Sequence, residues 1–272
     1  MNAPVASPPP EYRIGASVIQ SRQPQALRRV PVFVTALCHV RRGEKLLCWE
    51  ERQMRADARH LLLMPAGHEL HISNIPNAQG DYVADLVTFP KDMLRAFSVR
   101  YAEQFAARPR HPTVDLGVPL DPHTTRAWET LLACIEDGAP DALRTHHAEA
   151  VLLALGLAGR IAPLLQGRND PLCERVQEIV LRNPAHDWTA ASIAERLNLG
   201  ASTLRRQLAN ENSSFSQIVD RVRLGMALHR LQTTPWPIGE IAAASGYACA
   251  SRFAVRFRKH YGLSPRELRA TL

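Results

Sequence analysis

Two stretches of the chain share one pattern, and this pattern constrains the fold more than any other feature. Thr189–Leu208 and Ile238–Phe257 each combine a short apolar helix, a tight turn and a second helix whose outer face is polar and basic. In both stretches apolar residues recur at the spacing of an amphipathic helix. A helix-turn-helix unit has this arrangement, because its second helix enters the major groove of DNA while its back rests on a core. Two such units predict a DNA-binding domain.

The second helix of the first unit is expected to hold an apolar back against the core. Leu204 and Leu208 stand one helical turn apart on that back, after a turn formed by Asn198-Leu-Gly200. The opposite side must then point outward. It presents Ser202, Arg206 and Asn210, with Thr203 and Arg205 on the flanks. Because arginine can bond a guanine edge or a phosphate, this helix has the side chains for DNA recognition.

The second unit repeats the pattern with different residues. Ile241 and Ala242 are expected to face inward, Gly246 to form the turn, and Phe253 and Phe257 to anchor the second helix. The outer face then presents Ser251, Arg252, Val255, Arg258 and Lys259, with Arg256 at its edge. The two recognition helices therefore offer different side chains to DNA.

Capping signals and a spacer place the two units in one helical domain. Phe215–Thr233 predicts a long helix between them, with Met226 or Leu224 among its buried residues. Thr189 is a candidate N-cap of the first unit. Ser264-Pro-Arg-Glu267 is a candidate capping box with proline at the first helical position of the last helix. We expect the long helix to be a rigid spacer that sets the distance between the units.

The first half of the chain has a different character. Short β-type runs separated by turn residues predict an antiparallel barrel or sandwich. These runs are Val32–Val40, Lys45–Trp49, Leu61–Met64, Leu70–Ser73 and Tyr82–Phe89. Helical spacing then predicts helices over residues 92–105, 122–136 and 141–165. The last is apolar almost all round over residues 150–158, so it either packs on its own barrel or contributes to a dimer interface. The fold class predicted is α+β.

Composition shifts give the domain boundaries. Residues 1–29, which begin with a proline-rich stretch, are predicted to be a disordered arm, residues 30–166 a sensing domain, residues 167–171 a linker and residues 172–272 the DNA-binding domain. From Pro171 onward the chain holds 14 Lys/Arg against 8 Asp/Glu, whereas the first 170 residues hold 19 against 18. Nearly all of the formal net charge of +7 therefore lies in the last third, as expected of a module that binds nucleic acid.

The C-terminal third resembles the AraC/XylS family of bacterial transcription regulators. The resemblance rests on these residues: Arg223-Leu-Gly-Met-Ala227, Ile238-Gly-Glu-Ile-Ala242, Gly246-Tyr247, Ser251-Arg-Phe253, Phe257-Arg-Lys259 and Tyr261-Gly-Leu-Ser-Pro-Arg266. It implies a seven-helix domain whose two recognition helices enter adjacent major grooves. Carried over by position, it implies DNA contacts at Ser202, Thr203, Arg205, Arg206, Ser251, Arg252, Arg256 and Arg258.

The chain departs from the family pattern at two positions. Val255 stands where the family often has arginine, so we expect the second unit to rely more on contact with thymine methyl groups. Gly200 stands where a serine cap is common, which weakens the cap and keeps the turn.

The first domain is similar to the cupin-like sensing domains that precede this DNA-binding domain in many family members. The resemblance implies either a small-molecule effector in the barrel or a regulatory protein docked on the domain. The alternative function is a metal-dependent cupin enzyme fused to a DNA-binding domain, which would use residues such as His60, His68 and His71. Their spacing lacks a close His-x-His pair, so we expect no metal, no other cofactor and no enzyme activity. Cys38 and Cys48 are either a thiol switch or small buried side chains.

The remaining expectations concern partners and location. The five cysteines form no CxxC pair and predict a reducing compartment, and the longest apolar run is too short to cross a bilayer. We therefore expect a cytoplasmic protein without a membrane partner. The family resemblance implies a promoter as the DNA partner, activation through RNA polymerase, and homodimer formation as one alternative.

Overall fold

A computed structural model describes residues 14–49, 51–106, 116–165 and 171–272. The chain divides into two compact units, and each unit is made of two separate stretches of sequence. The N-terminal unit contains Met1–Pro24 and Val32–Gln166, and the C-terminal unit contains Gln25–Pro31 and Gly167–Leu272. The first is built on antiparallel sheets and the second is mainly helical, so the α+β prediction is confirmed.

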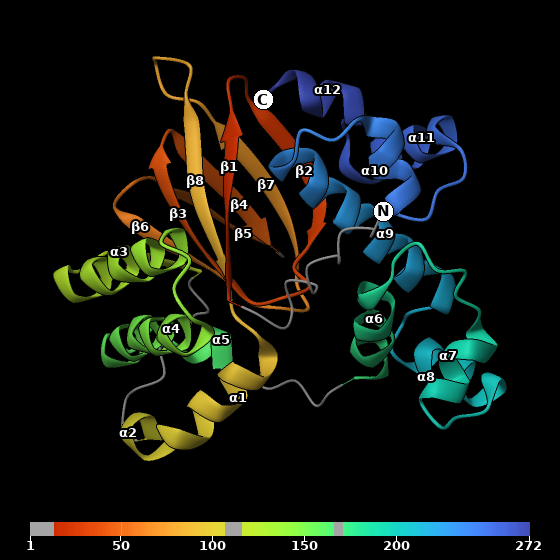
Figure 1. Cartoon of the computed structure of the whole chain (residues 1–272), viewed down its shortest axis with the longest axis horizontal. Coiled ribbons are helices and arrows are strands. Elements are labelled where there is room, and N and C mark those ends of the chain that lie inside the picture. Colours follow the sequence, from red (N-terminus) through yellow and green to blue (C-terminus); the bar gives the residue numbers. More distant parts are fainter. Residues whose placement is uncertain (1–13, 50, 107–115, 166–170) are drawn as a thin grey trace. The chain divides into compact units, whose positions relative to one another are not determined.

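Antiparallel strands form the framework of the N-terminal unit (Figure 1). The first sheet contains, in spatial order, β1 (Gly15–Ser21), β8 (Tyr82–Thr88), β3 (Ala36–Arg42), β6 (His60–Met64) and β9 (Gly117–Pro119). In the second sheet, β4 (Glu44–Trp49) lies between β7 (Glu69–Ile75) and β5 (Arg52–Ala56). Burial alternates along β4, where Lys45, Leu47 and Trp49 are buried, because successive side chains of a strand point to opposite faces.

Helices complete this unit. They are α1 (Lys91–Arg100), α2 (Ala102–Ala106), α3 (Pro122–Glu136), α4 (Asp141–Leu157) and α5 (Ala162–Leu165). The carboxylate of Asp121 accepts hydrogen bonds from the backbone N–H groups of His123 and Thr124, and this cap fixes the start of α3 where the sequence predicts it. α3 and α4 lie side by side in Figure 1. Leu131 on α3 and Leu155 on α4 are fully buried.

The structure differs from the sequence predictions at the start of the chain. Residues 1–29 are predicted as a disordered arm, yet β1 and β2 (Gln25–Pro31) occupy most of residues 15–29. The residues of β1 that alternate between its two faces are mostly small or polar, so the strand lacks the apolar–polar alternation by which a strand is predicted from sequence. β5 and β9 are also unpredicted. Residues 1–13 and most of the predicted linker lie outside the described residues.

Two predicted helices are interrupted in the structure. The helix predicted over residues 92–105 is divided at Tyr101 into α1 and α2. The helix predicted over residues 141–165 ends at Leu157, and Gly159 takes a φ of 72° before α5 begins. Glycine adopts this left-handed conformation readily, so it ends the helix although the apolar pattern continues. Leu143, in the first turn of α4, is half exposed.

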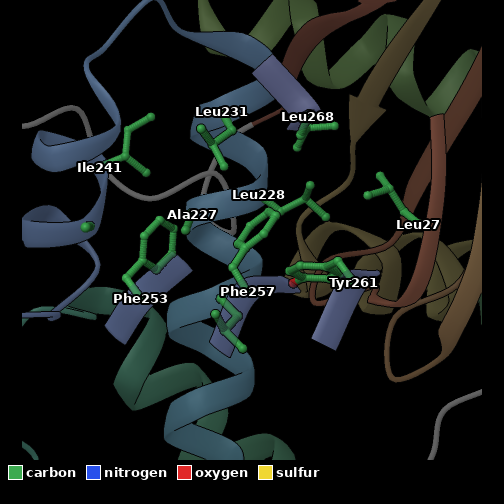
Figure 2. Packing of buried hydrophobic residues seen from close by; sticks show 11 residues of the cluster. Leu27, Ala227, Leu228, Leu231, Ile241, Phe253, Phe257, Tyr261 and Leu268 are labelled. Carbon is green, nitrogen blue, oxygen red and sulfur yellow. The ribbon is translucent and has the colours of Figure 1, made fainter. Parts of the chain in front are cut away.

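The C-terminal unit contains the predicted helices at close to their predicted limits. They are α6 (Leu172–Arg182), α7 (Ala190–Arg196), α8 (Ala201–Asn210), α9 (Phe215–Thr233), α10 (Ile238–Ala244), α11 (Ala250–Tyr261) and α12 (Pro265–Ala270). Around the second half of α9, buried side chains of α10, α11 and α12 form one apolar cluster, to which β2 adds Leu27. Figure 2 shows Phe253, Phe257 and Tyr261 of this cluster packed near Ala227 and Leu228.

Within the described ranges, no helix is both long enough and apolar enough to cross a bilayer.

Candidate functional site

The two helix-turn-helix units close their turns in the same way. In the first unit Asn198 has a φ of 54°, and the N–H of Leu199 donates to the carbonyl of Ala194 at 2.8 Å. In the second unit Gly246 has a φ of 81°, and the N–H of Tyr247 donates to the carbonyl of Ala242 at 2.9 Å. A left-handed residue followed by this hydrogen bond reverses the chain after a helix. The predicted turns are therefore present in both units.

Recognition helix α8 has the polarity that the sequence predicts. Leu204 and Leu208 are fully buried, as predicted for the back of this helix. Thr189 accepts from the backbone N–H of Ser192 to cap α7, whereas Gly200 begins α8 without a side-chain cap. The predicted DNA-contact residues of this helix are Ser202, Arg205 and Arg206, which are exposed, and Thr203, which is half-buried.

Recognition helix α11 is anchored by three aromatic rings on one side. Phe253, Phe257 and Tyr261 are fully buried, and the centroids of neighbouring rings are 5.5 and 4.7 Å apart. The other side is exposed and includes Ser251, Arg252 and Val255, whose side chain is 70% exposed. The sequence therefore predicts correctly which face of α11 is buried.

The basic side chains of the two recognition helices differ in their ionic partners. Arg256 forms an ion pair with Asp220 of α9, and Arg258 lies 3.5 Å from a carboxylate oxygen of Glu267. Arg205 and Arg206 of α8 form no ion pair within the described residues, and the same holds for Arg252 of α11. Arg205 and Arg206 can therefore bond a phosphate or a base without first exchanging a carboxylate partner.

Two arginines of α9 connect the long helix to both units. Arg223 donates from Nε to the carbonyl of Pro184 at 2.9 Å, in the segment that precedes α7. Arg230 donates from a terminal nitrogen to the carbonyl of Ala244 at 3.0 Å, at the end of α10. At about 1.5 Å per residue, α9 is about 28 Å long. The predicted spacer is a continuous helix, with Leu224 rather than Met226 in its buried set.

Sequence reasoning missed two acidic residues that organise these helices. Asp220 was not singled out, although its place on the spacer lets it pair with Arg256. Glu211 accepts from the backbone N–H groups of Leu172 and Cys173, both at 2.8 Å, and so caps α6 from the end of α8. No local spacing could reveal either contact, because each partner lies more than 30 residues away in sequence.

Cys249 is a further residue without a sequence signal, at the N-cap position of α11. The backbone N–H of Arg252, followed by that of Ser251, lowers the pKa of its exposed thiol. The N–H groups at the start of a helix carry a partial positive charge, which favours the thiolate form of Cys249. In this motif the start of the recognition helix is the end that approaches DNA.

The N-terminal unit contains a buried polar group between its sheets. Lys45 is 4% exposed, and its ammonium donates to the side-chain oxygen of Asn74 at 2.5 Å and lies 5.2 Å from the centre of the Tyr82 ring. Burial lowers the pKa of Lys45. In the described part of the chain no carboxylate pairs with this ammonium, and the hydroxyls of Tyr82 and Ser21 have no hydrogen-bond partner. Ser21 and Tyr82 are direct neighbours across β1 and β8.

The histidines and cysteines considered in the sequence lie elsewhere. The Nδ1 atom of His60 is 2.9 Å from the carboxylate of Asp57, and that of His68 is 3.2 Å from the carbonyl of Ala66. The described residues bring together no group of three or more histidine, cysteine, aspartate or glutamate side chains that could hold a metal ion. Cys38 and Cys48 are free thiols on strands of different sheets, and burial raises the pKa of Cys38.

Known proteins match the C-terminal part of the chain by sequence. A family model described as a helix-turn-helix domain matches residues 193–271. The HTH-type transcriptional regulator GadX of Escherichia coli strain K12 is 36% identical over 93 residues, which are 34% of this chain and 34% of GadX. The HTH-type transcriptional activator CfaD of Escherichia coli is 31% identical over 94 residues, 35% of this chain and 36% of CfaD. The chain thus spans about a third of the length of these curated relatives.

One solved structure is similar over nearly the whole chain. ToxT from Vibrio cholerae superposes with a TM-score of 0.66 over 96% of this chain and 99% of ToxT, at 12% sequence identity. At this identity the likeness concerns the fold, and it extends the agreement from the helix-turn-helix region to the strand-rich unit.

Proposed function

We propose that this chain, whose C-terminal region is a helix-turn-helix DNA-binding domain of the AraC/XylS type, is a transcription regulator that binds promoter DNA with both of its units. The observation that carries the proposal is that each unit is complete. Each has the same turn hydrogen bond, and each has a second helix with a buried apolar back and an exposed basic side. An apolar back fixes such a helix while its outer side chains enter the major groove.

The first unit would read DNA through α8. We assign base and phosphate contacts there to Ser202, Thr203, Arg205 and Arg206, in line with the sequence prediction. The two arginines have no ionic partner to exchange within the described residues. A bidentate arginine–guanine contact is worth about 1–3 kcal/mol of discrimination, so we expect α8 to dominate base readout.

The second unit would read DNA differently. We assign contacts to Ser251 and Arg252 near the start of α11, and phosphate contacts to Arg256 and Arg258 after exchange of their carboxylate partners. Val255 projects from the same face with most of its side chain exposed. An apolar side chain in the major groove contacts the thymine methyl, so we propose a thymine-rich second half-element.

The effector would bind between the sheets of the N-terminal unit. Lys45, Ser21 and Tyr82 place a buried cation and two unpartnered hydroxyls among apolar side chains. A buried ammonium without a counter-ion favours an anionic ligand. ToxT structures carry an unsaturated fatty acid in one case and a naphthalenyl-butenoic acid in another, and both ligands are apolar carboxylic acids. We therefore propose an apolar carboxylic acid as the effector class.

A thermal-shift experiment on the full chain tests this effector. Oleic acid should raise the melting temperature of the wild-type chain, because a ligand that binds only the folded state stabilises it. A Lys45→Met variant should fold and lose the shift. An equal shift in both proteins would place the acid elsewhere, and no shift in either would favour a regulatory protein as the signal.

Assignment as a transcription regulator also implies RNA polymerase and a second copy of the chain as candidate partners. We propose a cytoplasmic regulator that activates through RNA polymerase, with α4 as the candidate dimer surface. The named relatives are transcription regulators, so we assign no enzyme activity. Stoichiometric metal retained after gentle purification would favour the alternative, a metal-dependent cupin enzyme.

Selection of bound sequences from a random duplex pool tests the DNA-binding proposal. The full chain should enrich a two-part site whose half-elements are about one helical turn apart. Enrichment of no sequence, with an affinity controlled only by salt, would contradict specific regulation.

A further inference from the structure

Strand β2 lies early in the sequence and nevertheless belongs to the C-terminal unit. We propose that β2 is a positioning element of the second recognition helix, so that readout by α11 depends on residues 25–31 while readout by α8 does not. The inference rests on the proposed DNA-binding function and deepens it, because it names the part of the chain through which one of the two units is controlled.

The apolar contact is made by Leu27. Its side chain is 3% exposed and is part of the cluster that contains Phe257, Tyr261 and Leu268, with Val30 packed at the edge. Figure 2 shows Leu27 facing this cluster from outside the C-terminal helices. A leucine buried to this degree fills space that a truncated side chain would leave as a cavity, so Leu27 is part of the core that supports α11.

Polar contacts follow the same strand along the end of α11. Gln25 donates from Nε2 to the hydroxyl of Thr271 at 2.7 Å, and both residues are buried. The carbonyl of Arg29 accepts from Nε2 of His260 at 3.2 Å. The strand therefore contacts the last turn of the recognition helix and the residue that follows α12.

Positive φ angles occur on both sides of this contact, and the one on the strand is unusual. Arg29 has a φ of 52°, which is uncommon for a residue other than glycine. Gly262, the C-cap of α11, has a φ of 90°, and a Cβ there would lie 3.8 Å from Cδ of Arg28. The C-cap of α11 therefore lies in ordinary van der Waals range of the Arg28 side chain.

The position of the strand in the sequence gives it a regulatory role. The residues directly before Gln25 and directly after Pro31 belong to the N-terminal unit, so the strand is covalently tied to that unit at both ends. A change in the N-terminal unit that moves these ends acts on the support of α11. Within the C-terminal unit the main contacts of β2 are with α9, α11 and the residue that follows α12. We therefore expect control to act on the second half-element alone.

The test uses the full chain and the duplex selected by the wild-type protein. Affinity is measured on this duplex and on two derivatives, each with one half-element scrambled. In Leu27→Ala, scrambling the half-element read by α11 should weaken binding much less than in the wild type, a loss of discrimination on the order of tenfold. Scrambling the other half-element should weaken binding as much as in the wild type. Leu131→Ala, a truncation of a fully buried leucine on α3, is the matched control and should keep both effects.

A second variant keeps the test decisive if Leu27→Ala fails to fold. Thr271→Val removes the hydroxyl to which Gln25 donates and should show the same selective loss in weaker form. Equal loss at both half-elements would mean that the strand only stabilises the domain, and unchanged discrimination at both would mean that it does not position α11. Either result overturns the inference. If the wild-type chain selects no sequence, the proposed function fails instead.

Discussion

The two helix-turn-helix units share one backbone design and differ in how far they depend on the rest of the molecule. In the first unit, a polar asparagine forms the turn and the arginines of α8 have no ionic partner in the described chain. In the second unit, a glycine forms the turn, two arginines of α11 pair with carboxylates, and strand β2 supports the end of the helix. The comparison suggests a division of labour. We propose that α8 supplies most of the base readout, whereas readout by α11 can be adjusted through β2.

The largest expected effect on the free energy of unfolding is that of a truncation in the aromatic core of the second unit. Phe253→Ala removes a fully buried ring from the cluster around α9 and should lower the free energy of unfolding by about 3–5 kcal/mol. Urea denaturation of the full chain measures this loss. Leu208→Ala, which truncates the buried back of α8, should cost about 2–5 kcal/mol. A small effect of Phe253→Ala would mean that the second unit does not depend on this cluster.

Arginine replacement tests which unit supplies readout. Arg206→Ala should weaken binding to the selected duplex by about 1–3 kcal/mol and relax sequence preference in its half-element. Arg256→Ala should weaken binding less, because this arginine already has a carboxylate partner in Asp220. Fluorescence anisotropy at fixed salt measures both affinities. If both variants lost the same affinity and the same sequence preference, α8 and α11 would not differ in base readout.

The turns of the two units can be compared by exchanging their left-handed residues, asparagine in the first unit and glycine in the second. A Cβ at Gly246 would lie 2.8 Å from the carbonyl of Pro184 and 2.7 Å from Nε of Arg223, and φ there is 81°. Gly246→Asn should therefore lower the free energy of unfolding by more than about 1 kcal/mol. Asn198→Gly should change it by less, since glycine adopts a φ of 54° readily. Thermal unfolding of the two variants gives the comparison, and equal tolerance at both sites would contradict the close approach at Gly246.

The smallest effect concerns acid stability of the second unit. The backbone N–H of Ser264, with a smaller contribution from Arg258, lowers the pKa of Glu267 below its ordinary value of 4.5. A lowered carboxyl pKa contributes stability that is present above the ordinary pKa and is lost as the pH falls through the lowered one. Between pH 7 and pH 3 the wild type should therefore lose slightly more stability than Glu267→Gln. Parallel pH profiles would show that this cap does not affect folding.

The sequence predicts the C-terminal unit closely because its determinants are local. Thr189 and Ser264 cap helices, Gly246 forms a turn, and the leucines of α8 recur at helical spacing. The sequence does not reveal β1 and β2, because β1 alternates through small and polar residues and β2 contains two adjacent arginines. The role of Leu27 could not be predicted, since it packs against residues about 200 positions later. The pairing of Arg256 with Asp220 depends on the crossing of two helices, which no local pattern encodes.

The spacing of the half-elements tests the central claim most directly. Both helix-turn-helix units adjoin one continuous helix, and we propose that their recognition helices meet DNA on one face. Inserting five base pairs between the selected half-elements turns one of them by about half a helical turn. The account predicts that the full chain then loses at least about a hundredfold in affinity, because only one half-element can be read at a time. Unchanged affinity on the lengthened duplex would contradict it.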